Sequence, residues 1–192
     1  MQRVVLALAM ATMQTSPAAS LALELRVFNG PDDVTRESRV AVYRAGERAD
    51  PLARSDVASG SLTFQVPAGF YDVQAILERD GRVIAIRWAE RLVVMAYPDE
   101  GGRHLEVINL KTGFGALQVR AKPGEAVPDV AIYVSGVRDR HAAARLAGEG
   151  YALFVVPSGS YDLLLRGARP AWHTQIDVPA DRTRLWFADV IR

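Results

Sequence analysis

Hydrophobic and polar residues alternate along most of the chain after residue 22, with the two-residue period of half-buried β-strands. Leu23, Leu25 and Val27, for example, alternate with Glu24 and Arg26. The same pattern predicts strands at 39–42, 61–66, 71–77 and 105–108, and then at 115–121, 129–135, 151–156, 160–166, 172–178 and 184–190. Many short strands separated by frequent turns predict an all-β sandwich fold rather than an α/β fold.

Three segments depart from simple alternation. Val83–Ile86 and Leu92–Met95 are continuous apolar runs, which are typical of strands buried on both faces. Arg140–Leu146 contains three consecutive alanines, so it is the one segment in which we expect a short helical turn.

Residues 40–72 and 130–162 are two copies of one pattern, ninety positions apart and without a gap, with 13 identities in 33 aligned positions. The shared residues are Val40/Val130, Ala41/Ala131, Tyr43/Tyr133, Gly46/Gly136, Arg48/Arg138, Ala53/Ala143, Gly60/Gly150, Phe64/Phe154, Val66/Val156, Pro67/Pro157, Gly69/Gly159, Tyr71/Tyr161 and Asp72/Asp162. An internal repeat of this kind predicts two similar domains. We place them at residues 23–112 and 113–192.

The sharpest local motif is a duplicated corner, Pro67, Gly69 and Tyr71 in the first copy and Pro157, Gly159 and Tyr161 in the second. Proline fixes its own φ near −65°, and a glycine two residues later supplies a positive φ, so we expect a type II turn between consecutive strands. The tyrosine then points into the core with its hydroxyl near a polar rim. We expect Gly60 and Gly150 to open this hairpin.

The pattern Gly-x-x-x-Phe-x-Val-Pro-x-Gly-x-Tyr-Asp resembles the transthyretin-like (prealbumin-like), carboxypeptidase-regulatory-like and surface-anchoring repeat domains. The resemblance covers roughly residues 23–110 and 115–190, and it implies two tandem immunoglobulin-like or prealbumin-like β-sandwiches. It also implies an accessory, binding or spacing module in an exported protein, and it is nearly silent on the ligand.

The N-terminus predicts export. Arg3 precedes an apolar run from Val4 to Met13, and a polar segment with small residues follows. We interpret residues 1–22 as a cleavable signal peptide, with cleavage after Ala19, Ser20 or Ala22, and a periplasmic or secreted location. The run is too short for a membrane-spanning helix, so no integral membrane span is expected in the mature chain. The alternative is a buried N-terminal strand or helix in a cytosolic protein.

Composition excludes several classes of protein. Hydrophobic residues make up 49% of the chain and charged residues 23%, which is an ordinary globular balance. The net charge of +1 gives no reason to expect nucleic acid as a partner. Cysteine is absent, which rules out disulfides, a thiol nucleophile and a thiolate metal site.

We find no catalytic motif, metal motif or cofactor motif in the sequence. His104, His141 and His173 are far apart in the chain and lack metal-ligand spacing. The acidic pairs Asp32-Asp33 and Asp99-Glu100 are turn clusters that lack the alternating carboxylates of a calcium loop. A Lys122–Asp189 isopeptide bond is a further alternative.

The tryptophans are the residues that most suggest a ligand, because an exposed indole can stack on a sugar ring. Trp172 follows Arg169-Pro170-Ala171, so we expect it near the rim of the sandwich and name it as the candidate ligand contact. Trp88 and Trp186 lie among apolar residues and are expected to pack in the core or between the domains. The ninety-residue spacing does not match the tryptophans, so the sequence does not support a binding site common to both copies.

The leading hypothesis is therefore a non-enzymatic, exported accessory module of the cell envelope that presents a rigid surface to a protein partner. The alternative is a carbohydrate-binding module that uses Trp172. A hydrolase is the third class, and it would require a histidine and an arginine to meet in one pocket.

Overall fold

The computed structural model describes residues 20–55, 62–95, 103–121, 125–127, 129–148, 150–166 and 169–188. Within these ranges the chain forms strands and one 3-10 helix. Their bounds are β1 Ser20–Asn29, β2 Asp32–Asp33, η1 Thr35–Glu37, β3 Ser38–Arg44, β4 Ala53–Ser55, β5 Leu62–Pro67, β6 Gly69–Arg79, β7 Arg82–Val94, β8 Arg103–Asn109, β9 Phe114–Ala121, β10 Asp129–Val134, β11 Leu146–Gly148, β12 Tyr151–Pro157, β13 Gly159–Arg166, β14 Ala171–Val178 and β15 Thr183–Ala188.

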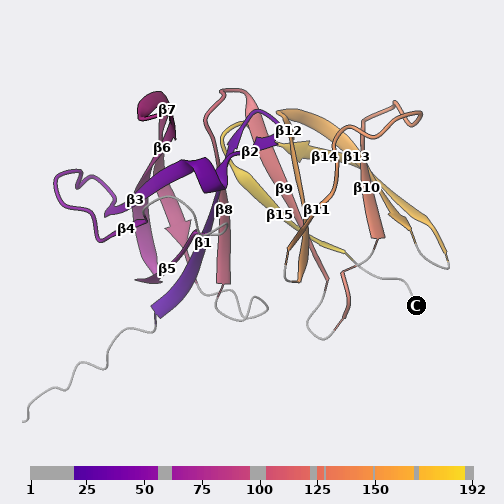
Figure 1. Ribbon diagram of the computed structural model, residues 1–192. Helices are drawn as coiled ribbons and strands as arrows, with labels where there is room; N and C mark the ends of the chain where they lie inside the picture. The colour runs from indigo at the N-terminus through magenta and orange to yellow at the C-terminus, as the bar shows by residue number, and fades with distance from the viewer. Residues whose placement is uncertain are drawn as a thin grey trace, which may run out of the picture.

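These strands form four sheets, two from each half of the chain (Figure 1). In the first half, β1 pairs with β2, β5 and β8, and a second sheet has the order β4-β3-β6-β7. In the second half the orders are β11-β12-β9-β15 and β10-β13-β14. The first and last strands of each half are parallel neighbours, β1 with β8 and β9 with β15, whereas the other pairs are antiparallel.

Each pair of sheets encloses its own hydrophobic core, because alternate residues of its strands face inward. Leu23 and Leu25 of β1 share one buried cluster with Val73 and Leu77 of β6. The second cluster is built in the same way, with Leu117, Phe154, Ile132 and Leu163 among its fully buried members. The predicted all-β fold of two sandwiches is therefore confirmed. We call them the first and second sandwich.

A third apolar cluster joins the two sandwiches. Its buried residues are Phe28, Leu105 and Val107 from the first sandwich and Ala116, Tyr151, Leu153 and Val155 from the second. The Tyr151 hydroxyl also donates a hydrogen bond of 2.8 Å to Glu24 Oε1 across this contact. Burial, followed by the bond to Glu24, raises the pKa of Tyr151, so the phenol stays protonated and remains a donor.

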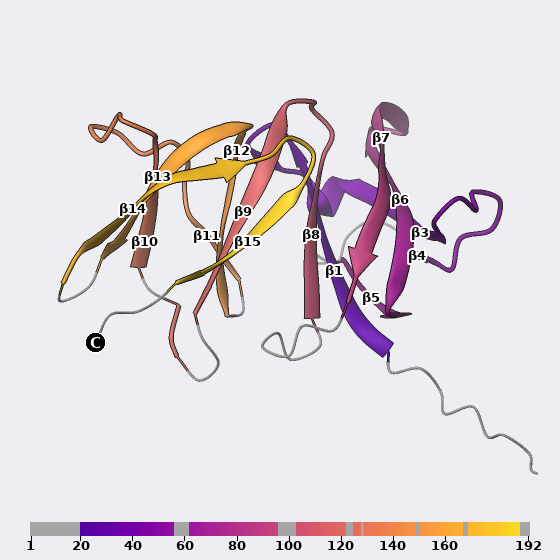
Figure 2. The same ribbon diagram turned by 180° about the vertical axis from the view of Figure 1, so that it is seen from behind.

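Two polar contacts extend the junction along β8 and β7. The backbone N–H of Val107 donates to Thr183 Oγ1 at 2.8 Å, and the Arg87 guanidinium pairs with Asp181 at 2.7 Å. Figure 2 shows β8 lying between β1 of its own sheet and the strands β9 and β15. The two sandwiches are therefore packed against each other rather than separated by an open linker.

The apolar runs in β7 do not lie where the sequence analysis placed them. Val83, Ile84 and Ile86 are 53–54% exposed, and Val93 is 36% exposed. The expectation of burial on both faces is wrong, because only one face of β7 turns toward the core and no described element covers the other. The segment Arg140–Leu146 also contains no helix, since its last residue already begins β11 and the preceding ones form bends and irregular loop.

The first strand begins at Ser20, within the segment that we assigned to a signal peptide. Leu21 is buried in the first core and pairs with Val66 of β5. Residues 1–19 lie outside the described residues, so the signal peptide and the domain limits at 22 and 112 remain predictions. In the part of the chain that the structure describes, no helix has the length and apolar character needed to cross a bilayer.

Candidate functional site

The two Pro-x-Gly-x-Tyr corners carry the chain from one sheet of a sandwich to the other. β5 ends at Pro67, and β6 begins at Gly69 in the opposite sheet. The Tyr71 hydroxyl donates to the carbonyl oxygen of Pro67 at 2.6 Å, and in the second sandwich Tyr161 donates to Pro157 at the same distance. Burial raises the pKa of both tyrosines, which keeps the hydroxyls protonated.

Two details of the expected turn are wrong. Neither Gly69 nor Gly159 has a positive φ, because each is already the first residue of the next strand. β5 and β6 are also not hydrogen-bonded to each other, so the corner is not a hairpin. Gly150 does have a positive φ and precedes β12, after a short connection from β11. Gly60 lies outside the described residues.

Directly after each corner tyrosine is a buried aspartate that contacts two other segments of its sandwich, the loop after β3 or β10 and the bulge in β7 or β14. Asp72 accepts hydrogen bonds from the backbone N–H of Gly46 at 3.0 Å and of Arg91 at 2.8 Å, and it lies 3.8 Å from the Arg48 guanidinium. Burial by itself raises the pKa of this carboxyl group. The two N–H donors and the charges of Arg48 and Arg91 outweigh that effect, so the pKa of Asp72 lies below its ordinary value.

Asp162 repeats the arrangement in the second sandwich. It accepts from the Ser135 hydroxyl at 2.9 Å, from the Gln175 N–H at 3.2 Å and from Arg138 at 3.4 Å. Burial opposes the charge here as well, but these donors and the Gly136 N–H lower the pKa of Asp162. Arg91 and Gln175, which donate to the two aspartates, both have a positive φ at a bulge in β7 or β14.

The tryptophans occupy equivalent places in the two sandwiches, so the expectation that they do not match is wrong. Trp88 pairs across the sheet with Gln74, and Trp172 pairs with Leu164, which is the residue ninety positions after Gln74. The β6–β7 hairpin is six residues longer than the β13–β14 hairpin, which changes the spacing from ninety to eighty-four. Sequence alignment without gaps could not reveal this equivalence.

Each tryptophan is stacked with the repeated arginine and tyrosine. The Arg48 guanidinium lies 4.5 Å from the Trp88 ring centre, and Arg138 lies 4.2 Å from that of Trp172. Tyr43 and Tyr133 contact the same rings at 5.3 and 5.1 Å. Trp172 is 38% exposed, and Arg138 lies over one of its ring faces. This geometry fits a scaffold role in which the Arg–Trp stack holds the loop beside the buried aspartate.

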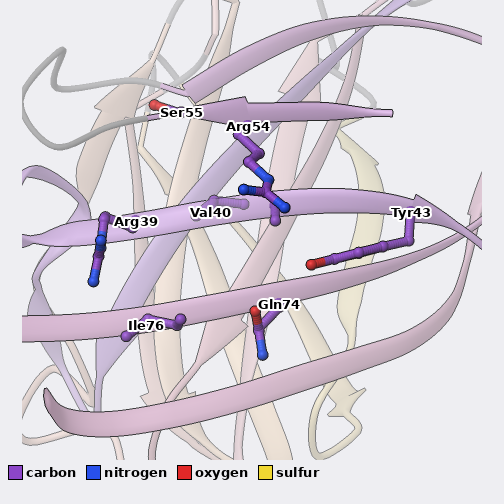
Figure 3. A pocket seen from close by; sticks show the side chains of 8 residues that line it. Arg39, Val40, Tyr43, Arg54, Ser55, Gln74 and Ile76 are labelled. Carbon is purple, nitrogen blue, oxygen red and sulfur yellow. The ribbon is translucent and has the colours of Figure 1, made fainter. Parts of the chain in front are cut away.

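A groove on the outer face of the first sandwich is the best candidate for a binding site (Figure 3). It has a volume of about 250 Å³ and lies across β3, β4 and β6. Arg39, Val40, Ala41, Tyr43, Arg54, Ser55, Gln74 and Ile76 line it. A second hollow of about 230 Å³ lies beside the junction with the second sandwich, where Arg87 already pairs with Asp181.

The groove continues into an apolar surface formed by the outward residues of β6 and β7. Ile76 of the groove pairs with Ile86, and Phe70 pairs with Val93 further along the same two strands. Phe70 is 55% exposed and Ile86 is 54% exposed. We call this surface, together with the groove, the β6–β7 face. The sequence pattern did not distinguish the residues of this face from core residues. A run of apolar residues in a strand does not show which face of the strand is covered.

The histidines do not form a common site. They lie on β8, in the loop after β10 and on β14, and their ring partners differ: Glu106 for His104, Tyr133 for His141 and Trp186 for His173. Among the described residues, no group of three His, Cys, Asp or Glu side chains is placed to hold a metal ion.

The acidic pairs and the two tryptophans expected to be packed differ in what they contact. Asp33 accepts from the Thr35 N–H at 3.0 Å and lies 3.9 Å from Arg26, so it stabilises its own turn. Trp186 packs against the second core as expected, whereas Trp88 belongs to the surface stack described above. The Asp99-Glu100 turn and the Lys122–Asp189 pair lie outside the described residues.

No protein-family model matches the chain, and no curated protein matches it in sequence. Among solved structures it is similar to the Bacillus anthracis TIE protein, with a TM-score of 0.36 and 14% identity, over 88% of this chain and 34% of that one. It is also similar to GBS52, the minor pilin of Streptococcus agalactiae, with a TM-score of 0.29 and 10% identity, over 88% of this chain and 94% of that one. A candidate adhesin from Bacteroides ovatus gives a TM-score of 0.31 and 14% identity, over 91% of this chain and 88% of that one. At identities and TM-scores this low, the similarities assign neither a family nor an activity to the chain.

Proposed function

We propose that this protein is a non-catalytic, exported interaction module of the cell envelope, and that its β6–β7 face binds a protein partner. The observation that carries the proposal is the exposure of Phe70, Ile86 and Val93 on one face of two paired strands. Exposed apolar residues that gather on one surface, beside polar ones, commonly mark a site of protein–protein contact.

The edge of the same sheet adds to this surface. β7 is the last strand in the order β4-β3-β6-β7, and no described strand pairs with its other side, although part of β7 lies at the junction, where Arg87 contacts Asp181. Where such a strand edge lies away from the junction, it can pair with an extended segment of another protein, in which main-chain hydrogen bonds give affinity and side chains give specificity. The packed junction between the sandwiches supports presentation of this face in a fixed orientation.

The charges on the face favour an acidic partner. Arg39 and Arg48 are paired with Glu78 and Glu90, but Arg54 has no carboxylate partner among the described residues. A partner with an acidic residue next to apolar ones would complement this combination of charge and exposed apolar surface. The predicted signal peptide is the support for placing the encounter in the periplasm or outside the cell.

Site-specific photocrosslinking in cells that produce the protein tests the proposal. A photoreactive phenylalanine is placed at Ile86 or Phe70, and the matched control is placed at Val137, which is 43% exposed on the second sandwich. We expect an adduct with a different protein from the first two positions and none from the control.

An adduct of twice the mass of the chain would identify a second copy as the occupant and contradict the proposal, as would adducts of equal yield from all three positions. Saturable binding on a glycan array that disappears in Trp172→Ala would favour the carbohydrate-binding alternative instead.

A further inference from the structure

Three hydrogen-bonding side chains from three different strands converge in the groove. Figure 3 shows the Arg54 guanidinium from β4, the Tyr43 hydroxyl from β3 and the Gln74 amide from β6 pointing toward one another across it. Arg54 pairs with no carboxylate among the described residues, whereas Arg39 at the other end of the groove is held by Glu78. A planar guanidinium beside a hydroxyl and an amide is a set of donors suited to a carboxylate.

The second sandwich shows what the same scaffold looks like without this set of donors. Tyr133 replaces Tyr43, but Ala144 and Leu164 stand at the positions ninety residues after Arg54 and Gln74. The sheet β10-β13-β14 also lacks a strand corresponding to β4, because β11 pairs with β12 of the other sheet. The second sandwich keeps the Pro-x-Gly-x-Tyr corner and the aspartate contacts without these two residues. Neither feature of the scaffold therefore requires Arg54 or Gln74.

An apolar shelf lies at the Ile76 end of the groove. Ile76 lines the groove and pairs with Ile86, which is 54% exposed and lies outside it. A ligand that reaches from Arg54 to these two residues needs a carboxylate followed by an apolar group. An extended peptide provides this combination when its acidic and apolar side chains are two residues apart, because such side chains point to the same side.

The aromatic rings near the groove do not offer the open face that a sugar ring needs. Tyr43 is only 6% exposed, and Arg48 already lies over the Trp88 ring at 4.5 Å. An acidic sugar would therefore gain the carboxylate contact without the stacking that usually accompanies it.

We propose that the groove binds the side-chain carboxylate of an extended acidic segment of a partner protein, through Arg54, Tyr43 and Gln74, with the apolar side chain two residues along that segment on Ile76 and Ile86. The proposal rests on the function proposed above and specifies which part of the β6–β7 face selects the partner. Arg54 and Gln74 determine specificity, because of the three converging donors only Tyr43 has a counterpart in the second sandwich.

NMR titration of the ¹⁵N-labelled full chain tests this. The probes are the blocked peptides acetyl-Glu-Ser-Val-amide and acetyl-Gln-Ser-Val-amide, and digalacturonate as an acidic sugar. We expect the glutamate peptide to shift the amide signals of Ala41, Tyr43, Arg54 and Gln74 saturably. The glutamine peptide should bind about tenfold more weakly or worse, because it loses the charge-assisted hydrogen bond.

Variants separate the groove from general charge effects. Arg54→Ala and Gln74→Leu should each weaken binding of the glutamate peptide, by about tenfold for the arginine. Arg145→Ala is the matched control, since Arg145 is an exposed arginine next to the position that corresponds to Arg54 in the second sandwich. It should leave binding unchanged.

Three results would overturn the proposal: equal affinity for both peptides, shifts that map outside the groove, or tighter binding of digalacturonate than of the glutamate peptide. If the peptides fail while Ile86 still forms a crosslink to another protein, the carboxylate site is wrong and the proposed function stands. If the peptides bind but no crosslink forms at Ile86 or Phe70, the groove chemistry stands and the proposed docking of a protein on this face is wrong.

Discussion

The apolar cluster between the sandwiches should make them unfold as one cooperative unit, and Phe28→Ala is the perturbation that tests this. The Phe28 side chain is fully buried in the junction, between β1 and residues from the second sandwich such as Leu153 and Val155. Truncation of a buried phenylalanine to alanine typically costs about 3–5 kcal/mol, through lost apolar contact and the cavity that remains. Because the cluster is shared, the loss should appear in the stability of both sandwiches.

Urea unfolding of the full chain, followed by hydrogen exchange at assigned amides of β6 and β13, reports on each sandwich separately. In the unchanged protein we expect both sets of amides to exchange with the same free energy of opening. In Phe28→Ala both values should fall, and the two transitions should separate because the coupling between the sandwiches is lost.

Phe154→Ala is the matched control, since Phe154 is equally buried but belongs to the core of the second sandwich alone. Phe154→Ala should lower the free energy of opening at β13 directly. It should lower that at β6 only because the intact junction couples the two sandwiches. A change of less than about 1 kcal/mol in both sandwiches on Phe28→Ala would refute the reasoning, since it lies far below the expected cavity cost.

Three further predictions concern the repeated clusters and the N-terminus. Tyr71→Phe and Tyr161→Phe each remove one hydrogen bond of 2.6 Å to a proline carbonyl, so each should lower the free energy of unfolding by about 1 kcal/mol in denaturant titrations, and no loss in either variant would show that the corner does not depend on it. The folded-state pKa of Asp72 and Asp162 lies below the ordinary value of 3.8, so their contribution to stability is present above pH about 4 and is lost as the pH falls through the folded-state pKa. The stability advantage of the unchanged protein over Asp72→Asn/Asp162→Asn should therefore be constant at neutral pH and shrink in acid, and an advantage that grows on acidification would contradict this assignment. Mass spectrometry of the exported protein should show a mature chain that begins at Ser20 or Leu21, because cleavage after Ala22 would remove the buried Leu21 from the first core.

The sequence predicted the fold well because it carries two clear signals. The two-residue alternation follows from strand geometry, and the ninety-residue repeat shows that the same unit occurs twice. Inward residues such as Leu23 and Phe154 occur at the positions that the pattern indicated. Alternation fails in β7, where the outward residues are as apolar as the inward ones. Ile86 is exposed because no described element covers it, and the sequence of one strand does not show whether another element covers it.

The candidate site was harder to predict, for two different reasons. The identity of Arg48 with Arg138 and of Asp72 with Asp162 was visible in the repeat, but it did not show that each arginine lies beside the buried aspartate. Trp88 and Trp172 escaped because a longer hairpin changed their spacing. The groove escaped because Arg54 and Gln74 come from strands that are distant in sequence and meet only in the folded sheet.

The parallel pairing of the first and last strands within each sandwich has a mechanical consequence. Residues 22–28 of β1 lie beside residues 103–109 of β8, so the chain enters at one end of this ladder and leaves at the other. Tension between the two ends would slide the strands past each other and load all of their hydrogen bonds together, instead of opening them one after another as in a pulled hairpin. Single-molecule stretching of the full chain should accordingly show high rupture forces.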